Sequence, residues 1–151
     1  MQILDATLRQ VLSQSGWSEE RQVDISQWVT ILEEAGFEMN QPSRVILRSI
    51  GGLTVAPALL ETRAYQPTIV HFDPLRLQFG FRRTPWEEYL GTTLSPLGEC
   101  EDDTSIYVGN DGRLYGSWDS LFECCGNDTE DSLKTLLLAD KKGTRLKLSS
   151  P

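Results

Sequence analysis

The sequence contains few of the residues that most often perform chemistry or hold metal ions. It has one histidine, His71, and three cysteines, Cys100, Cys124 and Cys125, among 151 residues. Neither a CxxC pair nor a histidine partner accompanies the cysteines, so their spacing does not indicate a zinc site. Thiols without a disulfide framework are typical of a reducing compartment, and we expect buried or half-buried free cysteines. A reactive thiol is the alternative.

Long apolar runs are also missing. The longest aliphatic stretch, residues 136–139, is far shorter than a membrane-spanning helix. The first residues show no basic segment followed by a long apolar run, which predicts that there is no secretory leader. We therefore expect a protein that acts in the cytoplasm without contacting a membrane.

The common catalytic motifs are absent as well, among them G-x-S-x-G, the P-loop and H-E-x-x-H. His71 lies between Val70 and Phe72 in a β-rich segment, which favours a structural histidine over a catalytic base or ligand. The acidic run at residues 99–103 lacks the alternating acids and central glycine of a calcium loop. We predict that the chain is not an enzyme and has no metal site and no cofactor.

Basic residues are scarce in the second half of the chain. Residues 87–140 hold thirteen acidic residues but only Arg113 and Lys134 as basic ones, whereas residues 1–86 are nearly neutral. The formal net charge is −8. Such a field repels phosphates, so we expect no direct binding of nucleic acid, and it speeds encounter with a basic protein. A solvated, solubilising face is the alternative.

What the sequence does contain begins with three helical patterns. An apolar stripe through Ile3, Leu4 and Leu8 predicts a first helix that ends at Gly16. A second helix is expected from Asp24, which would cap it together with Gln27 in a capping box. A third helix is predicted to begin at residue 42, a proline, and to end at the glycine pair 51–52.

Strand patterns follow. Residues 53–56, 68–72 and 75–79 are predicted strands, and residues 84–91 a short helix. The strongest strand pair is 105–109 with 113–118, because Asn-Asp-Gly between them accepts the positive φ of a tight hairpin. A last helix is expected near Asp128.

This order indicates an α+β fold with N-terminal helices packed on a mostly antiparallel sheet and a C-terminal helix. With no internal repeat or linker in the sequence, we expect one domain over residues 1–140 and a short basic tail over residues 141–151.

Five segments, taken in chain order, resemble the SUKH superfamily of bacterial immunity proteins, and its third subfamily in particular. They are GWSEERQVDISQWVTILEEAGFEM, RVILRSIGGLTV, HFDP, YLGTTLSPLGE and IYVGNDGRLYGSWDSLFECCGNDTEDSLKTLL. Together they run from about Gly16 to Leu138, nearly the whole chain. Residues 57–67 and 75–86, the cysteine pair at 124–125 and the basic tail depart from the pattern.

The resemblance implies an α+β domain without catalytic residues that binds a toxin and holds it inactive. The toxic domains neutralised by this family include nucleases and nucleic-acid deaminases. We therefore expect the partner to be a cognate toxin domain whose active site this chain occludes. The alternative is an interaction module of the same fold that acts on a host regulator. The sequence does not indicate an oligomeric state.

Acidic residues between Glu99 and Asp131 are the expected toxin contacts, because carboxylates can stand in for the phosphates of a nucleic-acid substrate. An exposed tryptophan beside them, Trp118, would serve as an anchor, with core packing as the alternative. The candidate contacts are Glu99, Glu101, Asp102, Asp103, Asp111, Trp118, Asp119 and Glu123.

Overall fold

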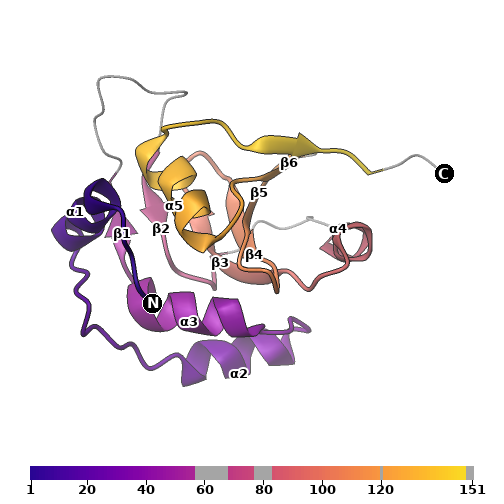
Figure 1. The fold of residues 1–151 in the computed structure, drawn as a ribbon. Helices are drawn as coiled ribbons and strands as arrows, with labels where there is room; N and C mark the ends of the chain where they lie inside the picture. Colours follow the sequence, from indigo (N-terminus) through magenta and orange to yellow (C-terminus); the bar gives the residue numbers. More distant parts are fainter. Residues whose placement is uncertain (57–67, 77–82, 120, 149–151) are drawn as a thin grey trace.

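The structure, a computed structural model, describes residues 1–56, 68–76, 83–119 and 121–148. Within these ranges five helices accompany one sheet of seven strands, in which every neighbouring pair is antiparallel (Figure 1). The helices are α1 (Ala6–Gln14), α2 (Ser26–Glu34), α3 (Gln41–Ile50), α4 (Arg83–Leu90) and α5 (Thr129–Leu138). The strands are β1 (Thr54–Val55), β2 (Val70–His71), β3 (Ser95–Cys100), β4 (Ser105–Val108), β5 (Leu114–Trp118), β6 (Leu121–Cys124) and β7 (Thr144–Leu146).

The strands follow one another across the sheet in chain order, from β1 at one edge to β7 at the other. Helices α1 to α3 precede the sheet in the chain, and α5 lies against it in Figure 1. The predicted α+β class, with N-terminal helices, an antiparallel sheet and a C-terminal helix, is confirmed.

The N-terminal helices differ in how they begin. The Asn40 side chain caps α3 by accepting the Ser43 N–H, and Pro42 lies in the first turn as predicted. The capping box predicted for α2 is wrong. Ile25 occupies its cap position, and Asp24 instead accepts hydrogen bonds from the Ser26 N–H and hydroxyl. Those bonds hold the pKa of Asp24 below its ordinary value.

The first helix is also shorter than its apolar stripe suggested. Ile3 and Leu4 precede α1, and only Ile3 is buried, whereas Leu4 is 75% exposed. Asp5 caps the helix by accepting the Leu8 N–H, so the chain turns before the regular helical spacing begins.

Both faces of the central strands are covered. The larger core cluster joins α1, α2, α3 and α5 to one face, where Ile106 and Leu114 lie. Their neighbours in the strands, Tyr107 and Tyr115, point to the opposite face and form a smaller cluster with Phe122. Trp86 of α4 stacks on Phe122 on this face, with 4.3 Å between the ring centroids. The middle of the sheet therefore has no open face, and its edges and strand ends remain accessible.

The predicted hairpin is confirmed, since Val108 pairs with Leu114 and Gly112 has φ +81°. Strands β3, β6 and β7 were not predicted. β7 lies inside residues 141–151, where a basic tail was expected, and pairs with β6. Of the strand expected at residues 75–79, Leu75 lies in a turn, and residues 77–79 fall outside the described residues.

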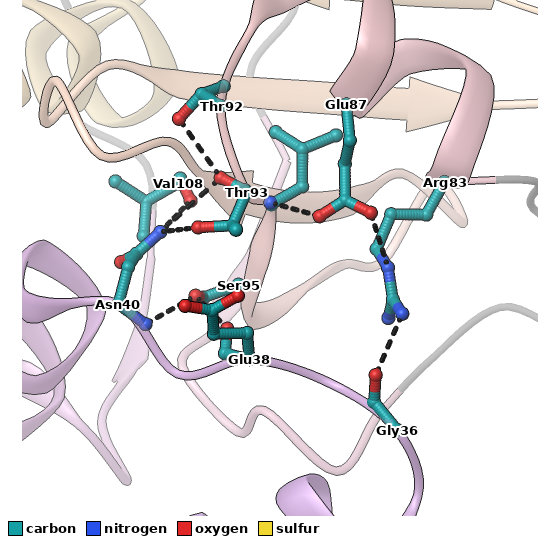
Figure 2. Close-up of polar contacts among 10 residues, drawn as sticks. Gly36, Glu38, Asn40, Arg83, Glu87, Thr92, Thr93, Ser95 and Val108 are labelled. Carbon is teal, nitrogen blue, oxygen red and sulfur yellow. Dashed lines mark hydrogen bonds and ion pairs between the residues drawn. The ribbon is translucent and has the colours of Figure 1, made fainter.

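A polar cluster fastens the α2–α3 connection to the sheet (Figure 2). Asn40, 6% exposed, donates from Nδ2 to the Val108 carbonyl at 2.9 Å and contacts Thr93 at 3.3 and 3.4 Å. The Asn40 N–H donates to the Ser95 hydroxyl, which in turn donates to the Glu38 carbonyl. The linker is thereby held against β3 and the end of β4.

The neighbouring contacts in Figure 2 hold α4 to the same connection. Arg83 donates to the Gly36 carbonyl at 2.9 Å and lies 4.1 Å over the Phe37 ring. Its Nε also pairs with Glu87, whose second oxygen accepts the Leu94 N–H. Arg83 thus joins α4 to the linker, and Glu87 joins α4 to the residue before β3.

Candidate functional site

Two turns meet at one end of the sheet. The turn between β3 and β4 precedes Ser105, and the turn between β5 and β6 follows Ser117. Ser105 and Ser117 are paired, so the two turns are neighbours. They bring together six of the eight predicted contact residues, a surface that we name the acidic end: Glu99, Glu101, Asp102, Asp103, Trp118 and Asp119.

The carboxylates of the acidic end are largely open to solvent. Glu101, Asp102 and Asp103 are all exposed, and Glu99 is half-buried. Asp102 accepts the Thr104 N–H at 3.2 Å, and Asp103 adopts φ +69°, so the turn is fixed by its backbone. Such a turn presents negative charge without burying it, which permits long-range attraction of a basic surface.

Trp118 is 50% exposed at the end of β5. Trp118 also lines a cavity of about 130 Å³ together with Leu121 and Arg145. Asp119 follows it with φ +53° and an exposed side chain. A half-exposed indole with charged neighbours provides apolar area that a partner protein can cover.

Of the two remaining candidates, the structure separates Asp111 from this surface, whereas Glu123 lines one groove with Asp102 and one cavity with Trp118. Asp111 lies in the β4–β5 turn, at the opposite end of those strands, where it accepts the Arg113 N–H and pairs with the Arg113 guanidinium at 3.5 Å. Glu123 lies within β6, opposite Arg145 of β7. The sequence could not show this separation, because it follows from strand pairing rather than from distance along the chain.

A groove of about 500 Å³ adjoins the acidic end. Asp102 and Glu123 supply acidic lining, while Lys142 and Arg145 supply basic lining, and Leu136 of α5 forms an apolar wall. The two basic residues were not among the predicted contacts. Their segment has the composition of a tail, and only the pairing of β7 with β6 brings it to the groove.

His71 is held between two polar side chains. Its Nδ1 lies 3.1 Å from the Thr54 hydroxyl, and its Nε2 lies 3.1 Å from the Glu101 carboxylate. Thr54 and His71 are directly opposite each other in β1 and β2, so the first contact is a cross-strand pair. The row links the β1 edge to the β3–β4 turn, in agreement with a structural role for His71.

The cysteines are free, and the expectation of buried or half-buried thiols is confirmed. Burial, assisted by the nearby Asp102 charge, raises the pKa of Cys100 to about 12. Burial also raises the pKa of Cys125. Cys124 is half-buried and donates to the Gly126 carbonyl. Since the thiolate is the nucleophile, the raised pKa values disfavour reactivity at Cys100 and Cys125.

The described ranges also bear on metal binding and on membrane insertion. No cluster of three or more histidine, cysteine or acidic residues is placed to hold a metal ion there. Among the helices of those same ranges, none has the length and apolar content needed to cross a membrane.

Comparison with known families decides the relationship. The model of the SUKH-3 immunity protein family matches residues 4–139. The chain belongs to this family. The matched region contains all five described helices and strands β1 to β6, and ends before β7. No curated protein and no solved structure matches the chain. Membership of SUKH-3 confirms the resemblance to the SUKH superfamily and implies a toxin protein as the partner; immunity protein families are generally non-enzymatic.

Proposed function

We propose that this protein binds a cognate toxin domain in the cytoplasm and occludes the active site of that toxin. The observation that carries the proposal is the SUKH-3 match over residues 4–139, since an immunity protein acts by binding. The toxin class proposed is one that acts on nucleic acid, a nuclease or a deaminase, because the exposed carboxylates of the acidic end would attract the basic residues with which such a toxin binds phosphate.

The acidic end supports a contact surface for this partner. Its exposed carboxylates attract basic residues that line a nucleic-acid active site, which raises the rate of encounter. Trp118 adds apolar area that becomes buried in the complex. Attraction at long range together with an anchor at short range is the combination found in very tight protein pairs.

Co-expression tests the function. The neighbouring open reading frame is expressed in a bacterial host with and without this chain, and growth is recorded. We expect arrested growth with the toxin alone and restored growth with both, together with co-purification of the two proteins. A neighbouring protein that is harmless to the host, or one whose toxicity this chain does not relieve, contradicts the proposal and favours the interaction module acting on a host regulator.

A further inference from the structure

The sheet ends in an edge with one pairing side unoccupied by any described strand. β7 is last in the strand order, and β6 is its one neighbour within the described residues. In Figure 1 it extends, as the yellow arrow, along the upper margin of the molecule, away from α1, α2 and α3. The outer side of such a strand presents backbone donors and acceptors to which another extended chain can bind.

The side chains of β7 and of the two residues after it define what kind of chain fits. The segment Thr-Arg-Leu-Lys-Leu at residues 144–148 alternates basic residues with leucine. Arg145 lines the groove on the face that α5 covers, whereas Leu146 packs against the Phe122 cluster on the face that α4 covers. Lys147 is exposed, and Leu148 is 39% exposed. A strand added here meets positive charge on one face and apolar surface on the other.

The charge on the basic side is not fully balanced by its neighbours. Glu123 lies opposite Arg145 on the inner strand, and Lys142 lines the same groove. Asp102 also lines this groove, so its two basic residues face two acidic ones. The excess of positive charge comes from Lys147, which is exposed directly after β7. An incoming strand with acidic residues on this face would form favourable cross-strand pairs.

The same charges oppose pairing with a second copy. When two β7 strands pair antiparallel about Leu146, Arg145 of each copy lies opposite Lys147 of the other. Like charges directly opposite each other are destabilising. Basic residues on an edge strand are a common means of preventing self-association, so the features of β7 favour a different partner over its own duplicate.

The edge is also continuous with the acidic end. Leu146, the last paired residue of β7, lies opposite Phe122, which is four residues after Trp118 in the β5–β6 hairpin. Trp118 and Arg145 line one cavity. A partner seated on the acidic end therefore lies within reach of the β7 edge.

We propose that the outer edge of β7 is the docking site for an extended segment of the toxin, added antiparallel or parallel as an eighth strand, in which acidic residues alternate with apolar ones. The inference rests on the proposed function in naming the toxin as the source of that segment. It assigns the toxin two contacts of opposite charge: a basic region at the acidic end and an acidic strand at β7.

A peptide titration tests the edge without the toxin. The probe is a synthetic eight-residue peptide of alternating valine and glutamate with blocked ends, and its control carries lysine in place of glutamate. Binding to the full isotope-labelled chain is followed by amide chemical shifts. We expect saturable shifts concentrated at residues 144–148 and Kd about tenfold lower for the glutamate peptide than for the lysine peptide.

Variants establish that the charges of β7 set this preference. Arg145→Glu with Lys147→Glu should reverse it, so that the lysine peptide binds more tightly. Arg48→Glu with Arg76→Glu changes the net charge equally at exposed positions away from the edge, and should preserve the preference. All four positions are exposed. Because Arg145→Glu also sets a carboxylate opposite Glu123, the thermal unfolding midpoint of every variant is measured alongside to establish that the fold is kept.

Three results overturn the inference: no saturable shifts at residues 144–148, equal binding of the two peptides, or a concentration-dependent dimer that the β7 variant dissociates. The last result would show that β7 pairs with a second copy of this chain and not with the toxin. The peptide titration uses no toxin, so a negative titration is distinct from a failed growth rescue. The growth rescue bears on the proposed function alone.

Discussion

Asn40 performs several hydrogen-bonding tasks from one buried position. Its Oδ1 caps α3 through the Ser43 N–H, while its Nδ2 donates to the Val108 carbonyl at the end of β4. An amide is the side chain that supplies an acceptor and a donor from neighbouring atoms. The position therefore accepts neither an apolar nor a charged residue without loss.

We predict that Asn40→Ala lowers the free energy of unfolding by about 2–3 kcal/mol, since it removes a helix cap and a buried hydrogen bond. Asn40→Asp should also destabilise at pH 7, because it places a carboxylate oxygen against the Val108 carbonyl while it keeps the cap. Urea unfolding of both variants measures this. The Asp variant should recover stability at pH 4, where a protonated carboxyl can donate; equal losses at both pH values would contradict this account.

At the scale of elements, the pairing of β2 with β3 depends on Gly98. The register of β3 against β4 shifts between Pro96 and Gly98. On the β2 side, a Cβ atom at Gly98 would lie 2.1 Å from the His71 carbonyl oxygen. That oxygen belongs to the backbone and cannot rotate away. Strand β2 would have to move, and with it the row that joins His71 to Thr54 and Glu101.

Gly98→Ala should therefore destabilise the fold by about 3 kcal/mol, at the upper end of the cost of inserting one methyl group into a packed site. Gly116→Ala is the matched control in the same sheet, where the nearest atom to the added Cβ is a Thr104 methyl at 3.2 Å. Thermal or urea unfolding of both variants provides the comparison. A loss at Gly116 as large as that at Gly98 would show that the close backbone approach is not the cause.

The start of α5 depends on two aspartates. Asp128 caps the helix by accepting the Asp131 N–H, and the Asp131 carboxylate accepts the Asn127 N–H at 2.8 Å and the Lys141 ammonium. The Lys141 contact and the Asn127 bond lower the pKa of Asp131 below its ordinary 3.8. The contact with Lys141 also joins the helix to the segment that leads into β7.

Because the folded pKa of Asp131 is lowered, its carboxylate stabilises the protein fully above pH 3.8 and loses that effect as the pH falls through the folded pKa. Asp131→Asn should cost about 1–2 kcal/mol at pH 7, as expected for hydrogen bonds to a charged group. The difference from wild type, measured by urea unfolding, should shrink between pH 5 and the acid limit. A difference that is constant over this range would contradict the assignment.

Elements with strong local signals could be predicted from the sequence. Pro42 before the α3 stripe, Gly112 in the hairpin turn and Asp128 before α5 each act through neighbouring backbone atoms, and all three were placed correctly. β3, β6 and β7 form strands through pairing with distant residues, which a single sequence does not display. The Asp24 cap failed for a local reason, since Ser26 competed for its carboxylate.

The candidate site also has a part that the sequence could predict and a part that depends on strand pairing. Exposed acidic residues could be expected from charge, but their grouping depends on the pairing of Ser105 with Ser117. That pairing joins two turns into the acidic end and sends Asp111 to the far end of the strands. Lys142 and Arg145 could not be predicted as groove residues, because only the pairing of β7 with β6 brings them to the groove.

For the whole molecule, charge should govern how fast the partner arrives. We predict that Asp102→Lys with Asp103→Lys slows association with the toxin about tenfold at low salt and flattens its salt dependence. Stopped-flow or surface binding at several salt concentrations measures this. Glu20→Lys with Glu34→Lys alters the net charge equally at exposed positions in the α1–α2 connection and at the end of α2, and should have a smaller effect. An unchanged association rate would remove the acidic end from the interface.

The family match stops at residue 139, but the hydrogen-bonded sheet continues to Leu146. A protein trimmed to the matched region would lose the strand that shields β6, uncovering its backbone and one side of Phe122, which is now 1% exposed. Bare edges of this kind template aggregation. The shortened chain should therefore form higher-mass species in sedimentation where the full chain does not, so the last few residues guard solubility as well as completing the architecture.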